Sequence, residues 1–317
     1  MADSTPSHVQ EKTFSSFNKA QGANYHQARR DYHPTLYKIL LDHHKSTGGG
    51  FNSILDIGCG PGTAVRTLAA HFDHAIGLDP SDGMIETARS LGGVTKAGAE
   101  IRFEISNADN LGTELPNPVQ DASVDLIVAA TCAHWFDMSA FWPRAAQVLR
   151  PGGTVAIWCS SSLKPHPDTP NAERITQALE EFQAGLEEYY LPGNRITRDL
   201  LRTLGLPWTI PNPVETFEEA SFRRQEWGTD EKSLPTDEYY NIRQDLSLAS
   251  VEMVLGTASP VIRWREAHPE KAGTKEDVVK IVLNKIEKAL RDAGVEFGKE
   301  LVKGGVMGVL LLVKKKA

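Results

Sequence analysis

The sequence predicts an α/β protein built on a doubly wound, mostly parallel sheet. Between residues 53 and 158, short apolar segments alternate with amphipathic segments of helical length. Helical crossovers of this kind join parallel strands that are buried on both faces. A glycine-rich loop, Gly58-Cys-Gly-Pro-Gly62, directly follows the first apolar segment. Open α/β sheets bind ligands at the carboxyl ends of their strands, so the position of this loop predicts a ligand site there.

Apolar runs and turn residues define the expected elements of this core. Strands are expected at 53–57, 75–78, 101–106, 124–130 and 154–158, and helices at 64–71, 83–91 and 141–149. Ser81 or Asp82 is the expected N-cap of the second of these helices. A helical stretch over 25–44, interrupted at Pro34, is expected before the first strand.

The regular alternation stops after Ser162. Helices are expected at 172–189, 236–255 and 275–293, an edge strand at 214–227, and a last strand at 304–314 that returns to the sheet. A helical insertion placed before that last strand would cover a site at the sheet edge. The predicted regions are a helical lead-in (1–45), the ligand-binding core (46–162), a cap with the edge strand that forms the substrate pocket (163–295) and the final strand (296–317).

Composition excludes several classes of partner. The chain has 317 residues and a net charge of −7, with no basic stripe, which disfavours nucleic acid as a partner. Its longest apolar run, 309–313, is far below the ~20 residues of a membrane-spanning helix, and residues 1–12 lack the apolar segment of a secretory signal. Three widely spaced cysteines, at 59, 132 and 159, lack metal-ligand spacing. We therefore expect a cytoplasmic monomer or homodimer with no metal, nucleic-acid or membrane partner.

Acidic residues follow three successive predicted strands. Asp56 immediately precedes the glycine loop, Asp79 ends the second strand and Asp109 follows the third. One such aspartate is more often a cap or a turn residue, but three at successive strand ends indicate a ligand. A nicotinamide dinucleotide brings a pyrophosphate, which an acid at the loop entrance disfavours. S-adenosylmethionine brings a sulfonium, an ammonium and ribose hydroxyls without phosphate, and therefore suits these acids better.

Two motifs carry a resemblance to a known family. Asp56-Ile-Gly-Cys-Gly-Pro-Gly62 and Gly77-Leu-Asp-Pro-Ser-Asp-Gly-Met-Ile-Glu-Thr-Ala-Arg89, followed by an acid after the third strand, resemble the class I S-adenosylmethionine-dependent methyltransferases. More narrowly, Ala133-His-Trp-Phe-Asp137 resembles the trans-aconitate methyltransferase group of carboxyl methyltransferases, as does the run from Leu149 to Trp158. The resemblance covers residues 14–160 and implies a seven-stranded, Rossmann-like sheet with a helical substrate cap. It also implies S-adenosyl-L-methionine as cofactor and S-adenosyl-L-homocysteine as product, with no metal.

The resemblance also implies residue roles on the cofactor side. The methionine part would be held by Asp56, Gly58 and Gly60, the ribose by Asp79, and the adenine by Met84, Ala108 and Asp109. Tyr25 and Arg29 would close over the cofactor from the N-terminal helix, with Arg29 paired to its carboxylate.

The substrate side carries weaker signals. His134 follows the fourth strand and has the chemistry of a base for a hydroxyl or thiol acceptor, whereas a carboxylate is already ionised and needs none. The other candidates are aromatic wall residues and arginines able to clamp a carboxylate: Tyr32, Trp135, Trp158, Arg195 and Arg223.

The leading hypothesis is carboxyl O-methylation of a small organic acid. Methylation of an alcohol, phenol or thiol remains open, as does a non-methylating cyclase or isomerase, or a cofactor-sensing protein, on the same scaffold. An NAD-dependent oxidoreductase is disfavoured by the glycine spacing and the acidic loop entrance.

Overall fold

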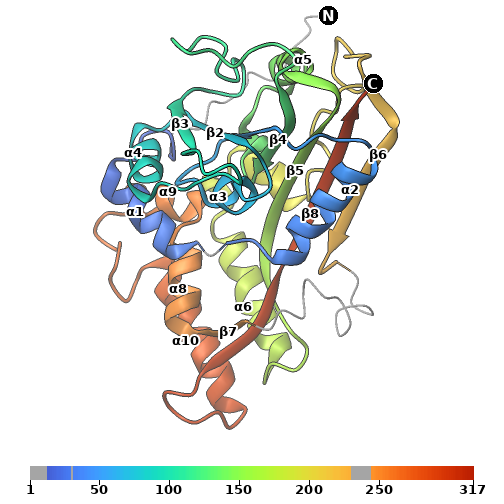
Figure 1. The fold of residues 1–317 in the computed structure, drawn as a ribbon. Helices are drawn as coiled ribbons and strands as arrows, with labels where there is room; N and C mark the ends of the chain where they lie inside the picture. The colour runs from blue at the N-terminus through green and yellow to red at the C-terminus, as the bar shows by residue number, and fades with distance from the viewer. Residues whose placement is uncertain (1–12, 30, 230–243) are drawn as a thin grey trace, which may run out of the picture.

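The centre of the protein is a sheet in the order β3-β2-β1-β4-β5-β8-β6, with the short strand β7 paired to β8 outside that path (Figure 1). The computed structural model describes residues 13–29, 31–229 and 244–317. The strands are β1 (Ser53–Ile57), β2 (His74–Asp79), β3 (Arg102–Ile105), β4 (Val124–Ala130), β5 (Leu149–Pro165), β6 (Phe217–Trp227), β7 (Gln244–Ser247) and β8 (Leu301–Lys315). The first five pair in parallel, and β8 runs antiparallel to its neighbours β5, β6 and β7. The predicted doubly wound, mostly parallel sheet is confirmed.

Helices connect these strands, and several of them begin at a side-chain cap. They are α1 (Lys19–Ala28), α2 (Pro34–Ser46), α3 (Thr63–Ala69), α4 (Asp82–Leu91), α5 (Met138–Val148), α6 (Ala172–Ala184), α7 (Pro192–Arg198), α8 (Leu248–Gly256), α9 (Ser259–Ala267) and α10 (Val278–Asp292), with 3-10 turns η1 (Ala133–Trp135) and η2 (Glu187–Tyr189). The expected cap of α4 is Ser81, whose Oγ accepts from Met84 N–H.

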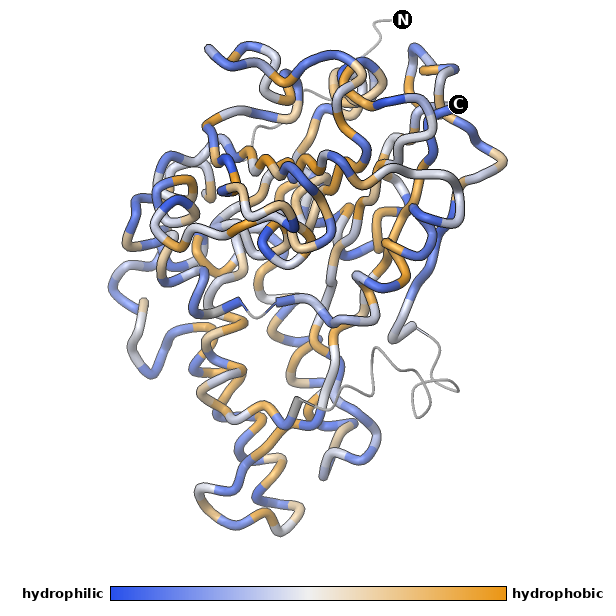
Figure 2. The backbone as a smooth tube through the Cα atoms, viewed as in Figure 1, coloured by the Kyte–Doolittle hydropathy of each residue, from blue (hydrophilic) through white to orange (hydrophobic). Residues whose placement is uncertain are grey.

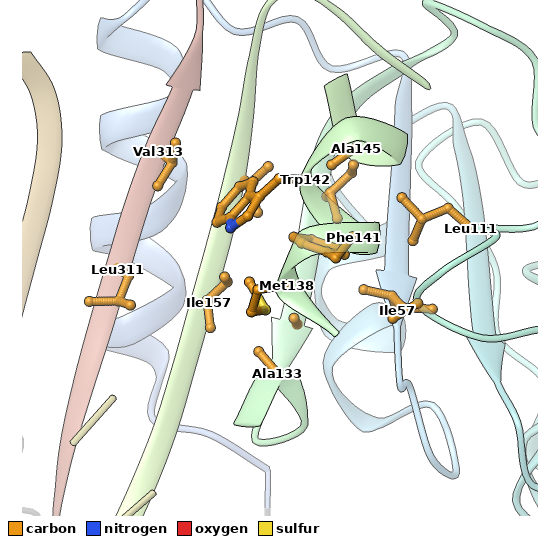
Figure 3. Close-up of a cluster of buried hydrophobic side chains, with 14 of the residues drawn as sticks. Ile57, Leu111, Ala133, Met138, Phe141, Trp142, Ala145, Ile157, Leu311 and Val313 are labelled. Carbon is orange, nitrogen blue, oxygen red and sulfur yellow. The ribbon is translucent and has the colours of Figure 1, made fainter. Parts of the chain in front are cut away.

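Both faces of the sheet are covered. Alternate residues of β4 point to opposite sides: Leu126 and Val128 join a cluster with α2, α3 and α4, whereas Ile127 and Ala129 join a cluster with α5. Figure 3 shows the second cluster, in which Phe141 and Trp142 of α5 lie against the sheet. The two hydrophobic clusters fix the parallel strands between them, so that the carboxyl ends of these strands lie along the same edge of the sheet.

A third hydrophobic cluster joins α6, α8, α9 and α10 with β7 and the start of β8. Strands β5 and β8 are long enough to extend from the core sheet into this helical lobe (Figure 1). Figure 2 shows apolar residues along the inner sides of α8 and α10, as expected for helices that pack on each other. The lobe and the sheet therefore share a continuous antiparallel ribbon.

Several element boundaries differ from the sequence-based expectation. The helix expected at 236–255 is wrong over its described middle part: residues 244–247 form β7, and α8 begins at Leu248. Pairing of β7 with residues 301–304 of β8 satisfies its backbone groups, which local periodicity does not reveal. Residues 236–243 of that expected helix lie outside the described part of the chain.

The expected lead-in helix is two helices. α1 already begins at Lys19, where Asn18 forms a capping box with Gln21, and α2 begins at Pro34 after the N-cap residue His33. The helices α7 and α9 were not predicted, because their segments are short and their patterns weak. Of the helices that the structure describes, none is both long and apolar enough to cross a membrane.

Candidate cofactor and substrate site

The loop between β1 and α3 bends through three glycines with positive φ. Gly58, Gly60 and Gly62 have φ angles of +65°, +54° and +83°. A Cβ on Gly58 would lie 2.7 Å from Cys132 Cβ, whereas a Cβ on Gly60 would meet nothing nearer than Met84 Sδ at 4.0 Å. Gly58 is therefore required by packing against the end of β4, and Gly60 presents bare backbone to open space.

Two of the strand-end acids bind this part of the backbone. Asp79 accepts from Gly60 N–H and from Ser81 N–H, each over 2.9 Å. Asp56 is fully buried and accepts from Val65 N–H in the first turn of α3 over 3.2 Å. Burial raises the pKa of Asp56 well above its usual range, and the charge of Asp79 raises it further.

A cavity of about 1020 Å³ lies over this edge of the sheet. Of the predicted cofactor residues, its wall contains Tyr25, Arg29, Gly58, Gly60, Asp79, Met84, Ala108 and Asp109. Tyr32 and Trp135 of the predicted substrate residues also line it. The tertiary structure thus brings together residues from α1, the glycine loop, the ends of β2 and β4 and the loop after β3.

Arg29 is a cation of this wall. Its guanidinium carbon lies 5.5 Å from the Tyr25 ring centroid, which is a cation–π distance. Its Nε is buried and has no hydrogen-bond partner among the described residues. A buried N–H donor without a protein partner favours an anionic ligand group at this position.

Five predicted residues do not line the cavity: Asp56, His134, Trp158, Arg195 and Arg223. Trp158 is buried in the core, with its ring 5.3 Å from that of Tyr32. Arg195 is exposed and pairs with Glu187, and Arg223 is an exposed residue of β6 in register with Leu312.

His134 lies behind the wall rather than in it. It is 8% exposed, and a Cβ on Gly193 of α7 would lie 2.7 Å from its carbonyl oxygen, so α7 packs directly against η1. Burial lowers the pKa of His134 to about 3, and its Nδ1 has no partner among the described residues. The neighbouring Trp135 reaches the cavity instead.

Sequence reasoning missed several wall residues at the end of β4 and before α2. Thr131 has a φ of +58°, which is rare for a β-branched residue, and its Oγ1 lies 3.1 Å from the Tyr32 hydroxyl. Asp31 accepts from the Tyr37 hydroxyl and from Thr67 Oγ1, each over 2.6 Å. For Thr131, its position directly after β4 was the available signal, but left-handed backbone at a threonine is not visible in a sequence.

One part of the cavity wall is mostly apolar. It is formed by residues from β5 to β8 and from α8: Leu163, Trp227, Leu246, Met253, Val254 and Val306. We call this set the apolar wall. The hydroxyls of Ser160 and Ser250 also line this part.

Comparison with known proteins identifies the core. Residues 54–153 match the family model described as a methyltransferase domain. The sheet order and the glycine loop of this segment are those of the class I fold. This segment is similar to methyltransferase domains and has the class I fold. S-adenosyl-L-methionine is the methyl donor of such domains, and S-adenosyl-L-homocysteine is the product.

Individual relatives agree with this assignment of the methyltransferase domain. The chain is 30% identical over 138 residues to the probable S-adenosylmethionine-dependent methyltransferase CRG1 of Saccharomyces cerevisiae, over 44% of this chain and 45% of that protein. It is 33% identical over 129 residues to the O-methyltransferase cnsE of Penicillium expansum, over 40% of this chain and 45% of that protein. The chain therefore spans less than half the length of these two relatives.

A solved structure extends the likeness in fold beyond the methyltransferase domain. A candidate type II methyltransferase from Anaeromyxobacter dehalogenans superposes with a TM-score of 0.56 at 22% identity, over 91% of this chain and 97% of that one. The fold, including the helical lobe, is thus shared with a known protein.

The wall of the cavity fits the cofactor of the methyltransferase domain. Asp31, Asp79, Asp109 and Asp137 line it, whereas Arg29 is the only arginine or lysine among its described residues. This balance suits a ligand that carries a sulfonium and an ammonium and disfavours a pyrophosphate. The open backbone at Gly60 leaves room for close approach of the ligand.

Proposed function

We propose that the chain is an S-adenosylmethionine-dependent methyltransferase that methylates a carboxylate oxygen of a small organic acid. The cavity of about 1020 Å³ lies at the upper end of the range of about 300–1,000 Å³ for ligand pockets. Its lining combines the acids and the glycine loop with the apolar wall. Cofactor and acceptor would therefore meet within one enclosure.

The cofactor side has a role for each of its residues. Gly58 and Gly60 would hold the methionine part with backbone groups, and Arg29 its carboxylate. Asp79 would accept from the ribose hydroxyls, and Met84, Ala108 and Asp109 would enclose the adenine. Tyr25 would cover the ligand from α1, and Asp56 would support the site by holding the start of α3. When bound, the cofactor supplies an electrophilic methyl group on a sulfonium.

The observation that carries the carboxylate assignment is that the predicted base, His134, does not reach the cavity wall. His134 is buried behind it, with its pKa lowered to about 3. His33 lines the cavity, but its Nδ1 accepts from Thr35 N–H, so its neutral ring carries a proton on Nε2 and acts as a donor there. A carboxylate with a pKa of about 4 is ionised at neutral pH and needs no base, unlike an alcohol.

The remaining contribution of the chain is positioning and exclusion of water. The hydrogen-bonded hydroxyls of Tyr32 and Thr131 leave one O–H free to donate to a ligand, and Trp135 also lines the cavity. In-line methyl transfer depends mainly on such alignment. The name of the Penicillium relative, an O-methyltransferase, supports an oxygen acceptor. We infer that the helical lobe, within the cap region 163–295, completes the substrate pocket.

The stability of the methyl product toward mild base tests this proposal. Purified protein is incubated with methyl-labelled S-adenosylmethionine and a panel of organic acids, alcohols, phenols and thiols. Methyl esters release labelled methanol in mild alkali, whereas ethers and thioethers keep the label. We expect alkali-labile product from acids only. An alkali-stable product would replace the carboxylate by another acceptor, and bound cofactor with no label transfer to any compound would contradict methyl transfer itself.

A further inference from the structure

The apolar wall points to a particular class of acid. We propose that the acceptor carries a single carboxylate on an apolar body, and that this body binds the apolar wall. This inference rests on the proposed function, because it concerns the acceptor of the same site. It differs from the tricarboxylate that the family resemblance of the sequence would suggest.

The first argument is the convergence of apolar side chains from separate elements. Leu163 comes from β5, Trp227 from β6, Leu246 from β7, Met253 and Val254 from α8, and Val306 from β8. Pairing of β5, β6 and β7 with β8, together with packing of α8 in the helical lobe, brings these elements together. Their side chains line the same cavity as Gly60 and Asp79. A ligand bound there lies next to the cofactor side.

The second argument is the exposure of Met253. This side chain lines the cavity yet is 49% exposed, among the highest values for a large apolar residue in the described part of the chain. Covering such a surface with an apolar ligand is favourable, and the flexible thioether adapts to ligands of different shape. Exposure of Met253 is therefore expected to fall when the acceptor binds.

The third argument is the fixed position of Trp227. Its indole packs so closely over Gly308 of β8 that a Cβ at this glycine would overlap the ring. The same indole is 7% exposed and lines the cavity. Gly308 thus allows Trp227 to lie flat against β8 as a rigid part of the apolar wall.

The fourth argument is charge. From the same elements as the apolar wall, the described lining adds only the hydroxyls of Ser160 and Ser250 and the glycines Gly304 and Gly305. Arg29, which is the only arginine or lysine in the described lining, belongs to the α1 side with Tyr25. Among the described lining residues, a second carboxylate in the apolar part would find no cation, and its loss of hydration would not be compensated. The described lining therefore disfavours di- and tricarboxylates.

Binding to the protein saturated with S-adenosylhomocysteine tests this inference without turnover. Titration calorimetry compares hexanoate, octanoate and decanoate with the diacids of the same chain lengths and with trans-aconitate. We expect the best monoacid to bind at least about tenfold more tightly than its diacid, because of the uncompensated second charge. Equal affinities, tighter diacid binding, or no binding of any monoacid would overturn the inference.

A charge introduced into the apolar wall provides the matched test. Met253→Lys should weaken octanoate binding and strengthen octanedioate binding, each by about tenfold, since the new ammonium pairs with the second carboxylate. Ile281→Lys is the control, because Ile281 of α10 is 44% exposed and lies outside the cavity wall. Affinity for S-adenosylhomocysteine in both variants reports folding. If Met253→Lys leaves the ratio of the affinities for octanoate and octanedioate unchanged, the apolar body of the acceptor does not bind at the apolar wall.

The two proposals fail in different ways. Tight monoacid binding without formation of a methyl ester would contradict the proposed carboxyl methylation and leave the apolar acid site intact. Formation of methyl esters from diacids or trans-aconitate in preference to monoacids would contradict the apolar acid site and leave the proposed carboxyl methylation intact.

Discussion

The backbone N–H of Gly60 donates a hydrogen bond to Asp79 Oδ2 over 2.9 Å. The other oxygen of this carboxylate accepts from Ser81 N–H, the residue that caps α4. One side chain at the end of β2 therefore fixes both the glycine loop and the start of the next helix. Because Asp79 also lines the cavity, its charge serves the ligand and the loop together.

Asp79→Ala should weaken binding of S-adenosylhomocysteine by about 10- to 100-fold. Hydrogen bonds to a charged group contribute about 1.5–3 kcal/mol each, and the variant loses both ligand contacts and support of the loop. Titration calorimetry measures the change. Asp121→Ala, at an exposed residue away from the cavity wall, is the control and should bind as the unchanged protein does. Equal affinities of the two variants would contradict the role of Asp79.

Gly60→Ala should separate ligand binding from stability. Its φ of +54° costs an alanine about 1–2 kcal/mol in either state of the site, but no protein atom lies closer than 4.0 Å to the added carbon. Gly48→Ala is matched to it, since Gly48 has a φ of +81° with open space around it and lies outside the cavity wall. Urea unfolding should give similar losses for both variants. Only Gly60→Ala should lose cofactor affinity, and parallel behaviour of the two in binding would argue against close approach of the ligand at Gly60.

His134→Gln should retain most of the methyltransferase activity, within about tenfold, because a carboxylate acceptor needs no base. The lowered pKa of His134, about 3, keeps it neutral from pH 6 to pH 8, so this residue adds no rising limb to the rate profile. Initial rates across this range test both points. A rate loss of 10²- to 10⁴-fold together with a limb near pH 6.5 would indicate a hydroxyl or thiol acceptor and a catalytic role for His134.

His44 should make the protein less stable as the pH falls. Its Nε2 lies 2.7 Å from Gly50 O and its Nδ1 lies 2.7 Å from Thr154 Oγ1, which fits a neutral ring that donates from Nε2 and accepts at Nδ1. Burial lowers its pKa to about 4, and the charge of Lys314 lowers it further, against partial opposition from Gly50 O and Asp125. The unfolded chain, with a histidine pKa of about 6.5, takes up the proton first, so stability declines from pH 6.5 toward pH 4.

The expected loss from His44 between pH 7.5 and pH 5 is about 2 kcal/mol in the free energy of unfolding. Urea unfolding of His44→Gln and of the exposed-site control His71→Gln at both pH values isolates it. His44→Gln should flatten the pH dependence by this amount, whereas His71→Gln should leave it unchanged. Identical slopes in the two variants would mean that His44 is not held neutral by the fold. The pKa values of His43 and His134 are also lowered, so both residues add to the loss of stability at low pH, and they do so equally in the two variants.

The α/β core and the cofactor side of the site were predictable because their determinants are local. Apolar runs such as Val124–Ala130 are buried on both faces of a sheet, so they stand out in the sequence. Gly58 and Gly60 directly follow a strand, and Asp79 ends one, so strand topology alone brings them to one edge. The comparisons with known proteins confirm the fold and the cofactor that this pattern predicted.

The substrate side depended on contacts between distant segments. The doubly wound core and the residues at its carboxyl edge could be predicted from the sequence, because strands, helices and loop residues follow from local patterns. Tertiary packing decided that Gly193 of α7 lies against the Trp135 ring and the His134 backbone, that His134 is buried whereas Trp135 lines the cavity, and that Trp158 lies in the core. It also decided the apolar wall, whose members come from five elements. The physical reason is that the direction and burial of a side chain at a strand end are set by whatever packs on it, and those segments lie tens of residues away in the chain.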